Sequence, residues 1–388
     1  MALSAEAAVA VTEFRPSTAV RRPSKALFAA ALALPGLAAT LVQAQAATPP
    51  TQTSLELQYS HDQEFQPRAE RMEISAPSLF VIAPVGDQWA ANLFLTTDSI
   101  SGASPLYHDT LSGASGLGID DFRKAGSINF TRYFERATLR FGGAYSSEDD
   151  YIGRSLNVGA SLDSEDRNTS YDFAVAVNRD SIDSTNGVAE HETRRGEQLS
   201  VGLTRVLSRS SIIAASLGFA HGTGYFNDPY KPLDKRPDGR DETTLLVRYN
   251  KYYNSADAAL RLSYRYYQDS WALDAHTIEA AWEQNLAHDF ILTPSLRYYS
   301  QGKADFYVDP PFGEGFYPNR NYSADARLSA FGAWDVGLKL GLPEFAGWRA
   351  EVKFEFYRQK NSWALGSGSA ELAPFSARTW QLGLKHSF

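Results

Sequence analysis

The 388-residue sequence contains no cysteine and only two methionines. The absence of cysteine excludes a disulfide framework, cysteine-ligated zinc, iron–sulfur clusters, covalent c-type haem and a thiol nucleophile. The formal net charge is −8, so the chain lacks the basic footprint of a nucleic-acid-binding protein. We therefore expect no cofactor and no nucleic-acid partner.

Long apolar runs are also missing beyond the first part of the chain. The mean hydropathy is −0.33 although 43% of the residues are hydrophobic, and tyrosine (20) and phenylalanine (22) are abundant. These values exclude a bundle of transmembrane helices. They are compatible with a β-barrel, because its strands alternate between apolar and polar residues and average out to a mildly polar composition.

Residues 1–46 are typical of an export signal that is cleaved. A basic stretch ending at Lys25 precedes an apolar run, and Ala44-Gln45-Ala46 supplies a small-residue cleavage site. An uncleaved anchor is the alternative, but a proline and a glycine interrupt the apolar run. We expect residues 47–52 to form a short periplasmic segment and residues 53–388 to form one domain.

From Thr53 onward nearly every segment alternates with period two, which is typical of strands with two unlike faces. In Arg349–Gln359 the apolar residues all fall at even positions, and residues 328–342 show the same alternation. Strands of soluble sandwiches average about 5–6 residues. Many runs here last about 10–15 residues, which is the length that crosses a bilayer at a tilt. The pattern predicts a transmembrane antiparallel β-barrel whose apolar face contacts lipid.

Short turns alternate with longer polar loops along the chain. This arrangement predicts an up-and-down barrel of about sixteen strands, within a range of roughly 14–18, with short periplasmic turns, longer extracellular loops and both termini on the turn side. Around Trp271–Leu286 the alternation of apolar and polar residues shifts by one position, and we expect a bulge there. The long loop Gly102–Phe122 either folds inward as a constriction or is exposed outside the barrel.

The last segment of the chain alternates apolar residues with polar ones and carries an aromatic residue at its end. It resembles the recognition signal of outer-membrane barrels, although a tyrosine is commoner at the position of the histidine. This pattern predicts a location in the outer membrane of a Gram-negative bacterium, contact with its lipid, and recognition by the barrel assembly machinery. The predicted signal comprises Trp380, Leu382, Leu384, His386 and Phe388.

If the polar face lines the lumen, its charges are distributed unevenly. Early segments supply acidic residues, namely Glu56, Asp98, Glu135, Asp172 and Asp180. Later segments supply basic ones, namely Arg248, Arg261, Arg265, Arg297, Arg327, Lys339 and Lys353. In a closed barrel the two groups would face each other and orient polar solutes. Alternatively, the arginines pair with neighbouring carboxylates and simply fill the wall.

The sequence offers no catalytic or metal-binding motif. It contains neither HExxH nor a Gly-x-Ser-x-Gly elbow, and no loop has the spacing of an EF-hand. His221 and His276 lie on predicted strands close to serine, threonine or aspartate, as many barrel residues do. We therefore expect no enzyme, no catalytic residue and no metal site, and an enzyme at the rim is only a third hypothesis.

Five stretches, spread over most of the chain, resemble an uncharacterised bacterial outer-membrane β-barrel family (domain of unknown function 3570). They are Ser101–His108, Gly224–Lys231, Ser263–Ser270, Ala275–Thr277 and Pro374–Arg378. Members of that family tend to be encoded beside thioredoxin-like proteins, a small lipoprotein and flavin-attaching enzymes. The resemblance therefore implies an extracytoplasmic redox or electron-transfer system, in which a chain without cysteine serves only as a sheath. It supplies no catalytic residue.

Two main functions follow from these observations. The first is a porin-like channel for small polar solutes or ions across the outer membrane. The second is a barrel scaffold that docks a periplasmic redox or lipoprotein partner and whose lumen is occupied.

Overall fold

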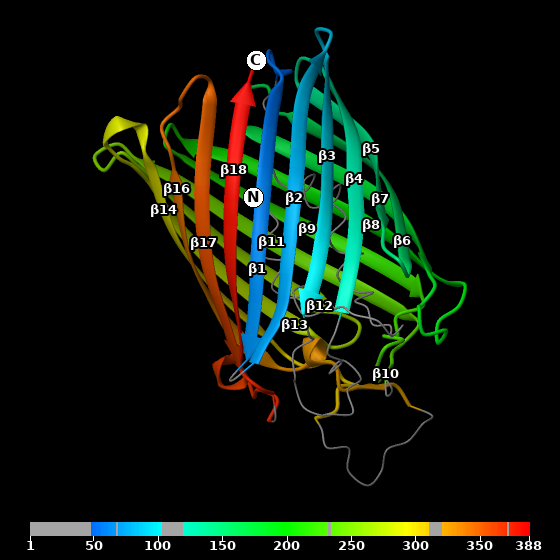
Figure 1. Cartoon of the computed structure of the whole chain (residues 1–388). Helices are drawn as coiled ribbons and strands as arrows, with labels where there is room; N and C mark the ends of the chain where they lie inside the picture. The colour runs from blue at the N-terminus through cyan, green and yellow to red at the C-terminus, as the bar shows by residue number, and fades with distance from the viewer. Residues whose placement is uncertain (1–47, 67–68, 103–118, 232–233, 310–319, 371) are drawn as a thin grey trace.

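The structure, a computed structural model, describes residues 48–66, 69–102, 119–231, 234–309, 320–370 and 372–388. In these residues the chain forms a closed antiparallel barrel of sixteen strands that pair in chain order, and β18 pairs with β1 to complete the ring (Figure 1). The predicted fold class is confirmed. The predicted export signal and residues 103–118 of the predicted constriction loop lie outside the described residues.

The wall strands are long, as the runs of alternation predict. They are β1 (Ser54–Gln66), β2 (Ala69–Val85), β3 (Trp89–Gly102), β4 (Ile119–Tyr133), β5 (Ala137–Ser147), β6 (Tyr151–Asp163), β7 (Thr169–Ile182), β8 (Glu192–Ser208), β9 (Ser211–Gly224), β11 (Gly239–Tyr253), β12 (Ala258–Asp269), β13 (Asp274–Asn285), β14 (Ile291–Gln301), β16 (Phe331–Gly341), β17 (Trp348–Lys360) and β18 (Phe375–Ser387).

The remaining elements are short. A separate two-stranded sheet joins β10 (Asp234–Lys235) to β15 (Tyr322–Ser323), and single 3₁₀ turns are η1 (Ala287–Asp289), η2 (Ala326–Leu328) and η3 (Asn361–Trp363). Among the described residues no helix has the length and apolar character needed to cross a membrane.

The alternation separates an apolar outer face from a polar inner face. On the outer face Leu156 and Val158 are 66% and 54% exposed, while the intervening Asn157 is buried on the inner face. Closure leaves no free sheet edge, so backbone amides of every wall strand pair with a neighbour. Hydrocarbon tolerates only such a self-paired backbone.

The two ends of the barrel differ. The first wall strand begins and the last wall strand ends at the end with the short turns, which we call the turn end, and backbone bonds of 3.0 and 2.9 Å link Thr53 and Phe388 there (Figure 1). The longer connections lie at the other end, which we call the loop end. The bulge predicted in Trp271–Leu286 is wrong. The register of β12, β13 and β14 is continuous there. The alternation of apolar and polar residues shifts there because residues 270–273 form a tight turn, in which Trp271 and Leu273 are buried in the core.

The strand predicted from residue 328 begins only at Phe331. Leu328 and Ala330 belong to the connection between β14 and β16, where both side chains are buried. Their alternation therefore reflects burial against other protein segments and not contact with lipid.

A hydrophobic core lies inside the barrel at the loop end. Loop residues meet inward-facing wall residues there, and the buried members are Phe226, Trp271, Leu273, Ala275, Tyr299, Ala304, Tyr307, Ala326, Leu328, Phe331, Ala333 and Leu372. The β9–β11 and β14–β16 connections thus fold back against the inner wall. We call their described residues, 225–231, 234–238, 302–309 and 320–330, the cap.

Candidate functional site

The inner face of the wall carries most of the charged residues predicted for the lumen. Strand register places on this face Arg248, Arg261, Arg265, Arg297, Lys339, Lys353, Glu56, Asp98, Asp172 and Asp180. The residues of the predicted C-terminal signal alternate with this face, and Trp380 and Leu382 are exposed on the outside. The outer face of β18 also carries an aromatic contact, in which the rings of Trp380 and Phe354 are 4.5 Å apart.

Two predicted lumen residues do not lie on the wall. Arg327 is part of η2 in the cap. The Asp325 carboxylate accepts a hydrogen bond from the Arg327 amide and so caps this 3₁₀ turn. Glu135 lies in the turn between β4 and β5, which a 2.8 Å bond from Phe134 N to Ala137 O closes. Neither position belongs to the alternating part of a strand.

Arg297 is the most connected charge on the wall. It is 6% exposed and lies between Glu279 and Asp335 in the register of three adjacent strands. Its guanidinium is 3.3 Å from Glu279 Oε2, 3.0 Å from Asp335 Oδ2 and 3.9 Å from Glu355 Oε1. One arginine therefore balances charge from three carboxylates.

Other wall cations are paired in the same way. Arg261 lies 2.7 Å from Glu283, Lys339 lies 3.0 Å from Glu351 and Lys353 lies 2.8 Å from Glu355. On the early strands Arg123 pairs with Asp98, and Arg194 pairs with Asp180 at 3.0 Å. The geometry thus favours local pairing over the opposed acidic and basic walls.

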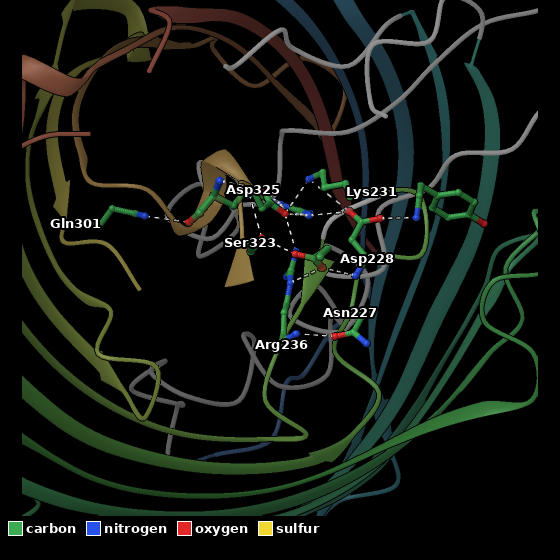
Figure 2. A network of polar contacts seen from close by, with 10 residues as sticks. Asn227, Asp228, Lys231, Arg236, Gln301, Ser323 and Asp325 are labelled. Atoms are coloured by element: carbon green, nitrogen blue, oxygen red, sulfur yellow. Dashed lines mark hydrogen bonds and ion pairs between the residues drawn. The ribbon is translucent and has the colours of Figure 1, made fainter. Parts of the chain in front are cut away.

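The cap contains a second charged cluster, shown in Figure 2. We call it the cap network, and it consists of Asp228, Lys231, Asp234, Arg236, Asp325 and Arg327. Figure 2 also shows that the ribbon of the barrel surrounds the cluster. The network holds three acidic and three basic side chains, so its formal charge is balanced.

Asp325 is the centre of the cap network. Its carboxylate lies 2.8 Å from Lys231 Nζ, 2.8 Å from Arg236 Nη2 and 2.9 Å from Arg327 Nε. Arg236 also binds Asp234 at 2.7 Å, and Arg327 reaches Asp228 at 3.1 Å. The network therefore ties the β9–β11 connection to the β14–β16 connection.

The equal number of acidic and basic side chains matters for stability because the cap network is buried. Asp325 is 2% exposed and Arg236 is 3% exposed. Burial alone raises the pKa of Asp325, but Arg327, Lys231 and Arg236 together outweigh it and hold that pKa well below the ordinary value. Burial also raises the pKa of Asp234, and Arg236 opposes that shift only in part. Each buried ion is costly unless it is paired.

The cap is also attached to neighbouring loops. The Tyr230 hydroxyl donates to Asp150 Oδ2 at 2.6 Å and accepts from the Thr185 amide at 3.0 Å. Asn186 donates to the Pro229 carbonyl at 2.8 Å. A tyrosine hydroxyl is protonated at neutral pH, and burial together with the Asp150 carboxylate raises the pKa of Tyr230 further, so it also remains a donor at higher pH. The segment 227–231 therefore joins three connections at the loop end.

The two histidines considered for catalysis lie on the outer face. His221 Nδ1 is 2.6 Å from Asp241 Oδ1, and both side chains are exposed. His276 Nδ1 is 2.9 Å from the Tyr264 hydroxyl. Within the described residues no group of three or more His, Asp or Glu side chains is arranged to hold a metal ion.

Acidification is expected to loosen the cap. The pKa of Asp325 is depressed in the folded protein, so its contribution to stability is present above the ordinary value of 3.8 and is lost as the pH falls below it. We expect hydrogen exchange in residues 225–231 and 320–330, corrected for intrinsic rates, to accelerate between about pH 4 and pH 2. The Asp325→Asn variant should lack this component. Equal pH dependence in both proteins would contradict the assignment.

Comparison with solved structures finds several similar proteins. A bacterial polysaccharide outer membrane secretin is 8% identical, with a TM-score of 0.51 over 89% of this chain and 100% of that chain. OccK2 (OpdF) of Pseudomonas aeruginosa is 12% identical, with a TM-score of 0.46 over 87% and 98%. OccD3 (OpdP) of the same organism is 11% identical, with a TM-score of 0.46 over 96% and 100%. At such identities the first similarity shows the fold alone, that of an outer-membrane β-barrel.

Sequence comparison identifies the family directly. No curated protein matches the sequence significantly. The model of the family described as protein of unknown function (DUF3570) matches residues 107–191 and 185–379, which is more than half of the chain. The resemblance inferred from the sequence is confirmed, and the chain belongs to the DUF3570 family.

Proposed function

We propose that the protein resides in the outer membrane of a Gram-negative bacterium and forms a channel for small polar solutes or ions. The observation that carries the proposal is the closed sixteen-strand wall with an apolar outer face and a charged inner face. Barrels of this size leave an aqueous channel unless something fills it. The more exposed paired charges of the wall, such as Arg261 with Glu283 and Lys339 with Glu351, present both signs to a passing solute.

The cap is the part of the barrel that would regulate its permeability. It occupies part of the mouth at the loop end, where its core packs on inward-facing wall residues such as Ala275 and Tyr299. A solute entering from outside must pass beside the cap network. We infer that the permeability of the barrel depends on how firmly this network holds the cap in place.

Planar-bilayer recording of the purified barrel tests the proposal. We expect stepwise conductance in potassium chloride and uptake of small sugars by proteoliposomes, because the inner face is polar. Lipid bilayers treated with detergent alone provide the baseline. A barrel that is correctly folded but silent at all voltages, and impermeable in liposomes, would contradict a channel.

Assembly into the outer membrane depends, in this proposal, on the strand that ends at Phe388. Phe388 is exposed on the outside and its backbone pairs with Thr53 at the seam of the barrel. We expect Phe388→Ser to reduce the folded, heat-modifiable protein in outer-membrane fractions several-fold, because the assembly machinery loses its aromatic end signal. Phe345→Ser, which removes an exposed phenylalanine from the turn between β16 and β17, is the matched control. Equal amounts of both variants would argue against recognition through Phe388.

The buried cap also favours a second candidate, a scaffold whose mouth is occupied. Such a barrel would dock a periplasmic redox protein or lipoprotein at its turn end. Crosslinking in intact cells followed by purification distinguishes the two. Recovery of one periplasmic protein in stoichiometric amount with a silent barrel would support the scaffold, whereas a conducting barrel recovered alone would support the channel.

A further inference from the structure

Three arginines lie side by side on the outer surface of the barrel. Arg154 on β6 is the direct register partner of Arg179 on β7, which in turn is the partner of Arg195 on β8. All three side chains are exposed and close to the loop end of their strands, which neighbour one another in Figure 1. We call this set the arginine row.

The arginine row has no anionic partner in the part of the chain that the structure describes. Among the described residues Arg154 donates to Ser181 Oγ alone, at 3.4 Å, and its guanidinium lies 5.9 Å from the centre of the Tyr145 ring. Glu197 follows Arg195 on the same face but forms no ion pair there with any of the three. Like charges directly opposite one another destabilise a sheet. An external anion would remove this repulsion.

The surroundings of the row indicate what kind of anion it is. Along the same strands toward the turn end, the outer face becomes apolar, with Leu156, Val158, Val175 and Phe173 all exposed. Tyr145, the register partner of Arg154, is also exposed beside the row. Aromatic residues at such a boundary mark the level of lipid headgroups. An anion bound here therefore sits where the hydrocarbon ends.

We propose that the arginine row binds the phosphorylated headgroup of an outer-leaflet glycolipid, whose acyl chains cover the apolar surface below it. This inference rests on the orientation in the proposed function, with the loop end outward. Guanidinium groups bind phosphate through two parallel hydrogen bonds, and they carry their charge at every physiological pH. Neighbouring strands are about 4.8 Å apart, so the three side chains can converge on one or two phosphates.

Native mass spectrometry of the full mature barrel in detergent tests the site, with bis-phosphorylated lipid A as the probe. The test variant carries Arg154→Gln, Arg179→Gln and Arg195→Gln. The control variant carries Arg167→Gln, Arg205→Gln and Arg209→Gln, three exposed arginines at the turn end, so the change in net charge is the same. We expect the test variant to bind lipid A at least ten-fold more weakly and the control to bind like the wild type.

Two further probes define the ligand. Removing both phosphates from lipid A should abolish the difference between wild type and test variant, and millimolar inorganic phosphate should not displace the lipid. Equal binding by wild type and test variant, an equal loss in the control, or displacement by free phosphate would each overturn the proposal. Conductance is measured on the same variants, so a silent barrel that binds lipid contradicts only the channel.

The single variant Arg179→Gln separates lipid binding from a structural role. It removes the middle charge of the row and therefore the repulsion on both sides. We expect its thermal stability in lipid-free detergent to equal or exceed that of the wild type, while its affinity for lipid A falls. A lower stability with unchanged affinity would show that the row serves the fold instead.

Discussion

Replacing Asp325 with asparagine is expected to release the cap and increase conductance through the barrel. Asparagine keeps the shape of the side chain and can still accept from the Arg327 amide, so η2 can form. The change leaves three buried cations, Lys231, Arg236 and Arg327, with only two carboxylates. Breaking a buried pair in this way typically costs about 3–5 kcal/mol. Since the network joins the two connections of the cap, we expect this cost to appear as opening of the cap.

Limited trypsin digestion and bilayer recording measure this opening. We expect faster cleavage within residues 320–330 and a higher mean open conductance in Asp325→Asn. Asp87→Asn is the control, since Asp87 is exposed in the turn between β2 and β3 at the other end of the barrel. Unchanged cleavage and conductance in Asp325→Asn would show that the network does not hold the cap.

A compensating substitution tests whether the charge balance of the cap network stabilises the cap. Lys231 is the most exposed cation of the network and lies 2.8 Å from Asp325. Adding Lys231→Gln to Asp325→Asn restores an equal number of acidic and basic groups. We expect the double variant to regain part of the protection against trypsin that Asp325→Asn loses. A further loss would indicate that Lys231 stabilises the cap independently of Asp325.

The wall of the barrel could be predicted from the sequence because lipid and water impose opposite requirements on alternate residues. The parity of each strand was sufficient to place residues such as Arg297 and Asp172 on the inner face. It was not sufficient to predict ion pairs, because these depend on the register between neighbouring strands. The pairing of Arg297 with both Glu279 and Asp335 follows from hydrogen-bond registers that no single strand specifies.

The cap could not be predicted in the same way. Arg327 reaches Asp228 across 99 positions in the sequence, and nothing in either loop alone indicates that they meet. Leu328 and Ala330 lie two positions apart and are both buried in a loop, so their pattern is the same as that of a strand and predicts a strand start at residue 328 that the structure does not have. The charges and prolines around residues 227–241 are typical of a loop, but they do not indicate which other segment the loop contacts.

Replacing Arg297 with glutamine is expected to destabilise the barrel and shift its selectivity toward cations. The substitution leaves Glu279, Asp335 and Glu355 around a neutral side chain. Loss of a buried partner costs about 3–5 kcal/mol, whereas loss of an exposed ion pair costs about 1 kcal/mol or less. Arg261→Gln, whose guanidinium side chain is 44% exposed beside Glu283, is therefore the matched control.

Thermal unfolding in detergent and reversal potentials in a salt gradient report the two effects separately. We expect Arg297→Gln to unfold at a clearly lower temperature than Arg261→Gln. We also expect a larger shift of its reversal potential toward that of a cation-selective pore, because the uncovered carboxylates face the lumen.

Arg297→Lys should recover little, since a single ammonium cannot reproduce the planar, multidentate contacts of a guanidinium. Adding Asp335→Asn to Arg297→Gln should recover stability, because Asp335 is the carboxylate nearest to Arg297, whereas Glu355 keeps its partner Lys353. If Arg297→Gln and Arg261→Gln behave alike in both measurements, Arg297 is not the centre of the wall's electrostatics, and the ion pairs of the wall contribute only locally.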